Sequence, residues 1–272
     1  MRTEISLSSN TLFHFTNSAE NLINILASGF SPRFCLEQFG ANHLMSGKST
    51  NTKEEDWEEA IPITCFCDLP ISHISSHLEF YGSYGIGLSK DWGKKNGLTP
   101  LTYIHDNSTQ IKYLKQIASL TKNVVFKIDG FEKMPLEENP LYALFELSGF
   151  YKPYHGEMWR INKYVTKRFY DEREWRYIPF LLPKEPGEFK EDYRLSKNEF
   201  LNEIKRAKAN KYVKENHPLE FDFKDIKYII IKNDNEAKAM TEAIYSSPKF
   251  NEEQKIILST KIISTEQIKE DF

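Results

Sequence analysis

The chain has 272 residues, with 36 Lys or Arg against 39 Asp or Glu, so its formal net charge at pH 7 is -3. That near balance excludes a strong global attraction to nucleic acid or to an anionic membrane. Three cysteines do not suggest a disulfide framework, and no apolar run approaches the ~20 residues that cross a bilayer. Met1–Ser6 lacks the apolar core of a signal peptide. We therefore expect a soluble, cytoplasmic protein.

The first predicted unit is a strand followed by a tight helix and a glycine. Leu12–Thr16 alternates between two faces in the manner of a short strand. Asn17 is the expected N-cap of the next helix, because Glu20 follows three residues later as in a capping box. Gly29 is placed to end that helix with a positive φ.

The middle of the chain combines a polar loop, a strand and a glycine-rich segment. Gln38–Ala60 is predicted to be a loop, Ile61–Cys67 a strand and Ile71–Phe80 a helix. Glycines in Tyr81–Lys90 indicate places where the backbone bends sharply or approaches another group closely. The spacing of these glycines is not that of a dinucleotide-binding fingerprint. Ser89 is the expected cap of a short helix.

The remaining pattern predicts α+β architecture, with mixed, mainly antiparallel sheets and flanking helices. The expected strands are Leu98–Ile104, Val124–Ile128, Ile226–Ile231 and Lys261–Ser264. The expected helices are Gln110–Leu120, Leu141–Gly149, Trp159–Arg168, Leu201–Glu215 and Glu236–Tyr245, with a loop at Phe150–His155. We interpret residues 1–272 as a single domain, with a core at about 10–180 and a C-terminal extension at about 181–272.

Tyr170–Pro179 is the most unusual stretch, because charge falls on both faces of a predicted strand. One face has Glu172, Glu174 and Arg176, and the other has Arg173, Trp175 and Tyr177. Charges are seldom buried unless they are paired or used. The strand therefore either lines a cleft or lies exposed with cross-strand ion pairs, and the stretch alone favours neither.

Three further groups of residues have a structural interpretation that we prefer to the functional one. Cys65, Cys67, His73 and His77 offer a zinc-type ligand set, but the cysteine spacing is unusual and core packing is favoured, so no metal site is predicted. Cys35, Cys65 and Cys67 have no local signal of an activated thiolate. The basic helix Leu201–Glu215 also contains acids, which favours a solvated face over a phosphate contact.

A fourth group supports a chemical hypothesis. His14 can donate a hydrogen bond to a ribose hydroxyl or diphosphate, and Tyr81 or Tyr84 can stack on a flat ring. Cleavage of the bond between nicotinamide and ribose develops positive charge on the sugar, which a fixed carboxylate such as Glu174 stabilises.

Two resemblances extend this hypothesis. The strand and helix at Leu12–Gly29 resemble the opening of DarT-like ADP-ribosyltransferases, and Glu172-x-Glu174 resembles the E-x-E signature of arginine- and nucleic-acid-directed ones. More closely, the chain resembles the AbiGi family of abortive phage resistance proteins over most of residues 10–180. That second resemblance rests on Leu12–Thr16, Pro32–Cys35, Cys65–Pro70, Tyr81–Ser89 and Phe169–Pro179.

The transferase resemblance implies NAD as a substrate and an ADP-ribosyltransferase-like core. It implies that His14 contacts the NAD ribose with Thr16 assisting, and that Tyr84, with Tyr81 nearby, stacks on nicotinamide. It further implies that Glu174 is the catalytic carboxylate beside Glu172, while Arg176 either neutralises Glu174 or binds the diphosphate. If so, His14, Tyr84 and Glu174 should converge on one cleft.

The leading hypothesis is therefore an antiphage protein that transfers ADP-ribose from NAD to nucleic acid or protein. The AbiGi family also carries an antitoxin label, which implies the alternative of a non-catalytic module that binds and silences a cognate partner. A metal-dependent nuclease acting through the acidic strand is a weaker alternative. No membrane partner is expected.

Overall fold

The computed structural model describes residues 8–37, 58–105, 107–125, 127–128, 138, 140–160, 163–179 and 194–271. The predicted loop Gln38–Ala60 lies outside these residues except for its last three, which are 58–60.

Within the described residues the largest feature is a nine-stranded sheet. Its strands are β1 (Thr11–Thr16), β2 (Arg33–Glu37), β3 (Glu59–Cys67), β4 (Tyr84–Ser89), β5 (Thr99–Pro100), β10 (Glu174–Tyr177), β11 (Leu195–Ser196), β12 (Ile226–Ile231) and β13 (Ile262–Ser264). The order is β13-β12-β4-β1-β3-β10-β5, and β2 and β11 also pair with β3. Only β12 and β13 run parallel in this sheet.

Two smaller sheets flank it. The parallel pair is β6 (Thr102–Ile104) with β7 (Tyr151–Pro153), and the antiparallel pair is β8 (Gly156–Arg160) with β9 (Lys163–Lys167). The predicted class, α+β with mainly antiparallel sheets, is confirmed for the described residues.

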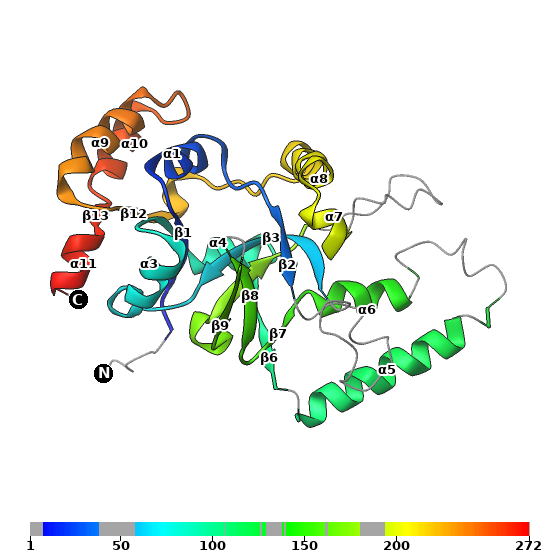
Figure 1. Ribbon diagram of the computed structural model, residues 1–272. Helices are drawn as coiled ribbons and strands as arrows, with labels where there is room; N and C mark the ends of the chain where they lie inside the picture. Colours follow the sequence, from blue (N-terminus) through cyan, green and yellow to red (C-terminus); the bar gives the residue numbers. More distant parts are fainter. Residues whose placement is uncertain are drawn as a thin grey trace.

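Helices surround the sheets, and Figure 1 shows where they lie in the molecule. The α-helices are α1 (Ala19–Ser28), α3 (Ser75–Tyr81), α4 (Lys90–Lys95), α5 (Thr109–Val125), α6 (Pro140–Ser148), α7 (Lys197–Leu201), α8 (Glu203–Asn216), α9 (Ala237–Ser246), α10 (Glu252–Ser259) and α11 (Thr265–Asp271). The 3-10 helices are η2 (Ile71–His73), η5 (Phe169–Glu172), η6 (Phe223–Asp225) and η7 (Asp234–Glu236). In Figure 1, α9, α10 and α11 gather at one end of the molecule, whereas α5 and α6 lie at the other end.

The main core lies around β12, β4 and β1. Ile229, Ile230 and Ile231 are buried, so β12 has apolar side chains on both faces. This burial explains the apolar run Ile229–Ile231, whereas Lys227 near the start of the strand is exposed; the predicted strand Ile226–Ile231 is confirmed. Buried Leu12 of β1 belongs to the same core.

The opening unit is confirmed except for its cap. Gly29 ends α1 with a φ of 78°, and its N–H donates to the Ile25 carbonyl. The N-cap is Ser18, because Ser18 Oγ accepts the Asn21 N–H at 3.2 Å. Asn17, the predicted cap, instead accepts from the Asn21 side chain at 3.3 Å.

Glycines in Tyr81–Lys90 allow strand β1 to pack close to the backbone of this segment. Gly82 has a φ of 113°, and a Cβ on it would lie 2.3 Å from the Thr16 carbonyl oxygen. A Cβ on Gly85 would lie 2.7 Å from the Phe15 ring. The group that approaches these glycines is therefore β1.

Several predicted elements are wrong. The described part of Trp159–Arg168 is not helical: it contributes to β8 and β9, which pair in antiparallel fashion with Met158 opposite Val165, a pair that suits strands. Residues 161 and 162 lie outside the described residues. Val124 belongs to the last turn of α5 and not to a strand. Phe126, within the predicted strand Val124–Ile128, lies outside the described residues. Phe150–His155 contains β7 and is not all loop, since Lys152 there pairs with Tyr103.

Other predicted elements are divided or shortened. The helix Ile71–Phe80 splits into η2 and α3, and the strand Leu98–Ile104 splits into β5 and β6 at Leu101. The charged strand is confirmed only for Glu174–Tyr177. Arg173 has a φ of 43° and ends η5, so Glu172 lies in a 3-10 turn and not on the strand.

Candidate functional site

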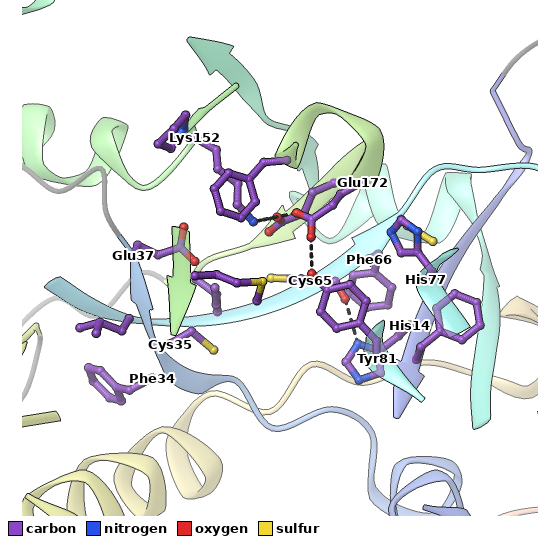
Figure 2. A pocket seen from close by; sticks show the side chains of 18 of the residues that line it. His14, Phe34, Cys35, Glu37, Cys65, Phe66, His77, Tyr81, Lys152 and Glu172 are labelled. Atoms are coloured by element: carbon purple, nitrogen blue, oxygen red, sulfur yellow. Dashed lines mark hydrogen bonds and ion pairs between the residues drawn. The ribbon is translucent and has the colours of Figure 1, made fainter. Parts of the chain in front are cut away.

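A cavity of about 300 Å³ lies where β1, β2 and β3 meet α3, β7, β8 and η5. Figure 2 shows it from close by. Its wall is mainly apolar, with Phe13, Phe34 and Phe66 among the lining residues. Its polar side is formed by Lys152, Glu172 and Glu174, together with the phenol of Tyr81. Because β3 is central, it places residues from distant parts of the chain around one space.

Glu172 and Glu174 are the buried charged pair of this cavity, with exposures of 3% and 4%. Lys152 Nζ lies 2.8 Å from Glu172 Oε2 and 2.7 Å from Glu174 Oε2. Lys167 Nζ lies 2.8 Å from Glu172 Oε1, and Tyr81 donates its hydroxyl hydrogen to the same oxygen. Glu174 Oε1 lies 2.8 Å from an Arg176 nitrogen. Each of the four carboxylate oxygens therefore contacts a cation.

Arg176 is fully buried and its guanidinium is divided among three acceptors. It donates to Glu174 at 2.9 Å, to the Gly149 carbonyl at 2.7 Å and to Glu37 at 3.1 Å. Three carboxylates (Glu37, Glu172, Glu174) thus face three cations (Lys152, Lys167, Arg176) in this cluster. Of the two roles considered for Arg176, the ion pair with Glu174 is the one present.

The electrostatics keep this cluster ionised. Burial alone would raise the pKa of the Glu174 carboxyl, but Arg176 and Lys152 outweigh it and hold that pKa below its ordinary value. Burial would also raise the pKa of Glu172, but Lys152 and Lys167 outweigh burial, so that pKa lies below its ordinary value. Burial and the adjacent Glu172 raise the pKa of Tyr81 well above its usual range. At neutral pH, neither carboxyl carries a proton that it could give to a leaving group.

His14 lies at another part of the cavity wall. Its Nδ1 lies 2.8 Å from the Cys65 carbonyl oxygen, which can only accept, so Nδ1 carries the hydrogen. Burial lowers the pKa of His14, partly offset by that hydrogen bond, and the ring is neutral. The ring also packs edge-on against Phe30, with centroids 5.0 Å apart.

The predicted site residues divide into two groups. His14, Tyr81, Glu172 and Glu174 line the cavity, and Arg176 contacts it through Glu174. Thr16 and Tyr84 are not among the lining residues. Thr16 Oγ1 accepts from the Asn21 side chain at 3.0 Å, and the Tyr84 hydroxyl donates to Glu236 at 3.1 Å. Of the expected trio His14, Tyr84 and Glu174, two therefore share the cavity.

The three cysteines and His77 also line this cavity, and burial favours the neutral form of each of these side chains. Burial raises the pKa of Cys35 to about 12, and it raises the pKa values of Cys65 and Cys67 as well. Burial also lowers the pKa of His77 to about 4, and His77 Nδ1 has no hydrogen-bond partner among the described residues. In the part of the chain that the structure describes, no group of three or more His, Cys, Asp or Glu is arranged to hold a metal ion.

Lys152, Lys167 and Glu37 are members of the cluster that sequence reasoning did not identify. Lys152 comes from β7, in a stretch interpreted as loop, and Lys167 from a strand interpreted as helix. No local pattern marks them, because their partners lie elsewhere in the sequence. The one available signal was that two buried carboxylates require at least two cations nearby.

Comparisons with known proteins define the class. A family model described as "Putative abortive phage resistance protein AbiGi, antitoxin" matches residues 29–232. The chain is also 30% identical over 265 residues to "Abortive phage resistance protein AbiGi" of Lactococcus lactis subsp. cremoris, a match that covers 89% of this chain and 99% of the relative. No solved structure matches this chain.

These matches place the chain among proteins of abortive phage resistance. It belongs to the AbiGi family, and the resemblance seen in the sequence is confirmed. Across the described residues, no helix is both long and apolar enough to span a membrane.

Proposed function

We propose that this chain is the antitoxin of an abortive-infection pair and that it acts by binding a cognate toxin, without catalysis. The observation that carries the proposal is the complete ion pairing of the Glu172 and Glu174 carboxylates. All four of their carboxylate oxygens contact Lys152, Lys167 or Arg176. The description of the matching family as an antitoxin supports the same role.

A catalytic carboxylate stabilises a transition state only through charge that is available when the substrate becomes cationic. Here the charge of Glu174 is already matched by Arg176 and Lys152, at 2.8 Å and 2.7 Å. A cationic sugar at Glu174 would have to displace a buried lysine or arginine. Desolvated ion pairs of this kind resist such displacement, because the displaced cation would lose its partners inside the protein.

The same occupancy disfavours the nuclease alternative. A divalent ion needs free carboxylate oxygens as ligands. In the Glu172 and Glu174 pair each oxygen already has a cationic neighbour.

A second candidate function is NAD-dependent ADP-ribosyl transfer. One specific observation favours it: His14, Tyr81 and Glu174, which are far apart in the sequence, line one cavity. In this candidate NAD enters between His14 and the acidic pair, and ADP-ribose is transferred to nucleic acid or protein. The position of Tyr84, whose hydroxyl donates to Glu236, does not support the stacking role expected of it.

Two assays separate these functions. The cognate toxin, taken as the product of the neighbouring gene, is co-expressed with the chain, and cell growth and co-purification are measured. The purified chain, alone and with the toxin, is then incubated with NAD labelled in the nicotinamide ring, in the presence and absence of lysate from phage-infected cells. Antitoxin function predicts restored growth, a stable complex and no release of nicotinamide. Nicotinamide release that is lost in Glu174→Gln would instead support the transferase.

A further inference from the structure

The cavity described above has no role in the proposed antitoxin function, and it lies at an opening in the main sheet. Along one edge of β3, β1 pairs at Cys67 and β2 pairs at residues 59–63. Between them, residues 64–66 have no partner strand on that edge within the described part of the chain. β1 and β2 therefore part along β3, and Figure 2 shows His14 of β1 and Cys35 of β2 among the side chains around the cavity.

The wall of the cavity suits a flat apolar molecule. Aromatic rings come to it from four elements: Phe13 from β1, Phe34 from β2, Phe66 from β3 and Phe169 from η5. A dry apolar cavity of about 150 Å³ takes up one benzene ring. The volume of about 300 Å³ therefore has room for about two fused rings. A mainly apolar cavity of this size with a few polar groups has the features of a small-molecule site.

The charges around the cavity are already matched by one another. Lys152 is the one Lys or Arg among the described lining residues, and it lies between the buried carboxylates of Glu172 and Glu174. Two other lining carboxylates have cations of their own, Glu37 with Arg176 at 3.1 Å and Glu58 with Lys197 at 2.8 Å. The remaining one, Glu157, is exposed. An anion would find no unpaired cation here, and a cation would find no unpaired buried carboxylate, so the wall favours an uncharged molecule.

Two neutral imidazoles in the wall have a nitrogen that the described chain does not pair. His14 Nδ1 donates to the Cys65 carbonyl at 2.8 Å, so Nε2 is an acceptor, and no described residue donates to it. His77 is 4% exposed, and its Nδ1 has no partner among the described residues. Polar groups inside proteins are usually hydrogen-bonded, so unpaired nitrogens in one wall indicate that a bound molecule supplies a partner. His14 is the better defined acceptor, because the Cys65 carbonyl fixes its tautomer.

We propose that this cavity binds an uncharged, flat molecule of about two fused aromatic rings, which donates one N–H or O–H hydrogen bond to His14 Nε2. The rings of the ligand pack against the aromatic wall, and the charged cluster stays paired within itself. NAD does not fit this description, because its diphosphate needs cations that are not already paired. Ligand binding in the cavity does not depend on the antitoxin function.

The test uses indole and benzofuran as probes of the purified full chain. Benzofuran has the shape of indole, but an oxygen replaces the N–H, so benzofuran cannot donate a hydrogen bond. Calorimetric titration should give a Kd for indole below about 1 mM. It should give about 5-fold weaker binding for benzofuran, the size of one lost hydrogen bond. The anion 2-naphthoate, which is also flat and bicyclic, should bind at least about 10-fold more weakly than indole.

Three variants locate the bound probe. His14→Phe removes the acceptor and keeps a flat ring, so the preference for indole over benzofuran should disappear. His73→Phe is the matched control, because His73 is exposed and does not line the cavity, and its preference should stay at about 5-fold. Cys35→Phe adds a ring to the wall and should weaken both probes at least about 10-fold, since it fills part of the cavity. Thermal unfolding verifies that each variant is folded, and Cys35→Leu replaces Cys35→Phe if that variant does not fold.

If neither indole nor benzofuran binds, or if filling the cavity at Cys35 leaves both affinities unchanged, the ligand site is overturned. A preference for indole that persists in His14→Phe would overturn the assigned hydrogen bond. Tighter binding of 2-naphthoate than of indole would overturn the uncharged class of ligand. Displacement of indole by NAD, which we do not expect, would assign the cavity to the transferase candidate instead. Toxin binding is measured separately, so failure of the probes to bind would leave the antitoxin function standing.

Discussion

Replacement of Lys152 by Met tests whether the charged cluster is held together as described. Lys152 Nζ is the group shared by the two carboxylates, at 2.8 Å from Glu172 and 2.7 Å from Glu174. Met fills a similar volume without charge. The variant would keep Glu174 paired with Arg176 and Glu172 paired with Lys167, but it would leave two buried carboxylates with one cation fewer between them.

The expected loss of stability is large because the carboxylates cannot reach water. Removal of one partner from a buried ion pair costs about 3–5 kcal/mol, since the remaining charge stays desolvated. Here one oxygen of each carboxylate loses its cation and the two negative charges repel each other, so we expect a loss within or above that range. Lys94→Met is the matched control: its ion pair with Asp91 is exposed, and its loss should change stability by less than about 0.5 kcal/mol.

Urea unfolding at pH 7 measures the difference, with the free energy taken from the midpoint and slope. The difference between Lys152→Met and the parent should shrink as the pH falls toward 4, because the unpaired carboxyls of the variant then take up protons in the folded state. A second change, Glu172→Gln in the Lys152→Met background, should recover part of the stability. A loss below about 1 kcal/mol in Lys152→Met would refute the claim that the cluster is a desolvated, mutually neutralised unit.

Two further predictions concern other parts of the fold. The pKa of His77 falls to about 4 on burial, below its unfolded value, so the unfolded chain binds the proton first as pH falls and stability is lost between about pH 6.5 and pH 4. Between pH 7 and pH 5, the free energy of unfolding of His77→Gln should therefore fall by about 2 kcal/mol less than that of the parent. Equal dependence of the two free energies on pH, measured by urea unfolding, would contradict this. Gly82→Ala should cost at least about 2 kcal/mol in thermal or urea unfolding, because its φ is 113° and its Cβ would lie 2.3 Å from the Thr16 oxygen. Gly97→Ala is also at positive φ, but no atom of the described residues lies within 4 Å of the added Cβ, so it should cost only about 1 kcal/mol. Equal losses at the two positions would argue against steric conflict at Gly82.

Local signals in the sequence were sufficient for the elements whose structure is locally determined. Ile226–Ile231 is a strand whose last three residues, Ile229–Ile231, are buried on both faces, and Gly29 ends α1 because only glycine adopts its φ cheaply. Ser89 caps α4 as expected, with its Oγ accepting the Trp92 N–H. In each of these cases the pattern and the tertiary structure agree.

The sequence was insufficient where tertiary contacts decide the local structure. The expected helix Trp159–Arg168 instead gives its first two residues to β8 and Lys163–Lys167 to β9, and the pairing of these two strands decides its structure. Strand alternation predicted that Glu172 lies on the same strand face as Glu174. In the structure, η5 ends at Arg173, which has a positive φ, and Glu172 lines the cavity from η5 and not from a strand.

The candidate site was predictable only where its contacts are local in the sequence. The charged stretch identified Glu174 and its partner Arg176, which are two residues apart on one strand. The contact of Arg176 with Glu37 spans 139 residues, and the contacts of Lys152 cross from another sheet, so no spacing in the sequence indicates them. Those distant cations are the observation that supports the proposed non-catalytic role of the acidic pair.

The most direct test of the antitoxin account is toxin neutralisation by the double variant His14→Gln with Glu174→Gln. Both changes conserve shape, and both affect residues that line the cavity. Because Glu174→Gln removes a charge from the buried cluster, Lys152→Met serves as a comparison of similar destabilisation without a change at either residue. If the chain neutralises the toxin by binding alone, the double variant, at equal folded concentration, protects cells from the co-expressed toxin as well as the unaltered chain does. Loss of protection in the double variant but not in Lys152→Met would contradict it.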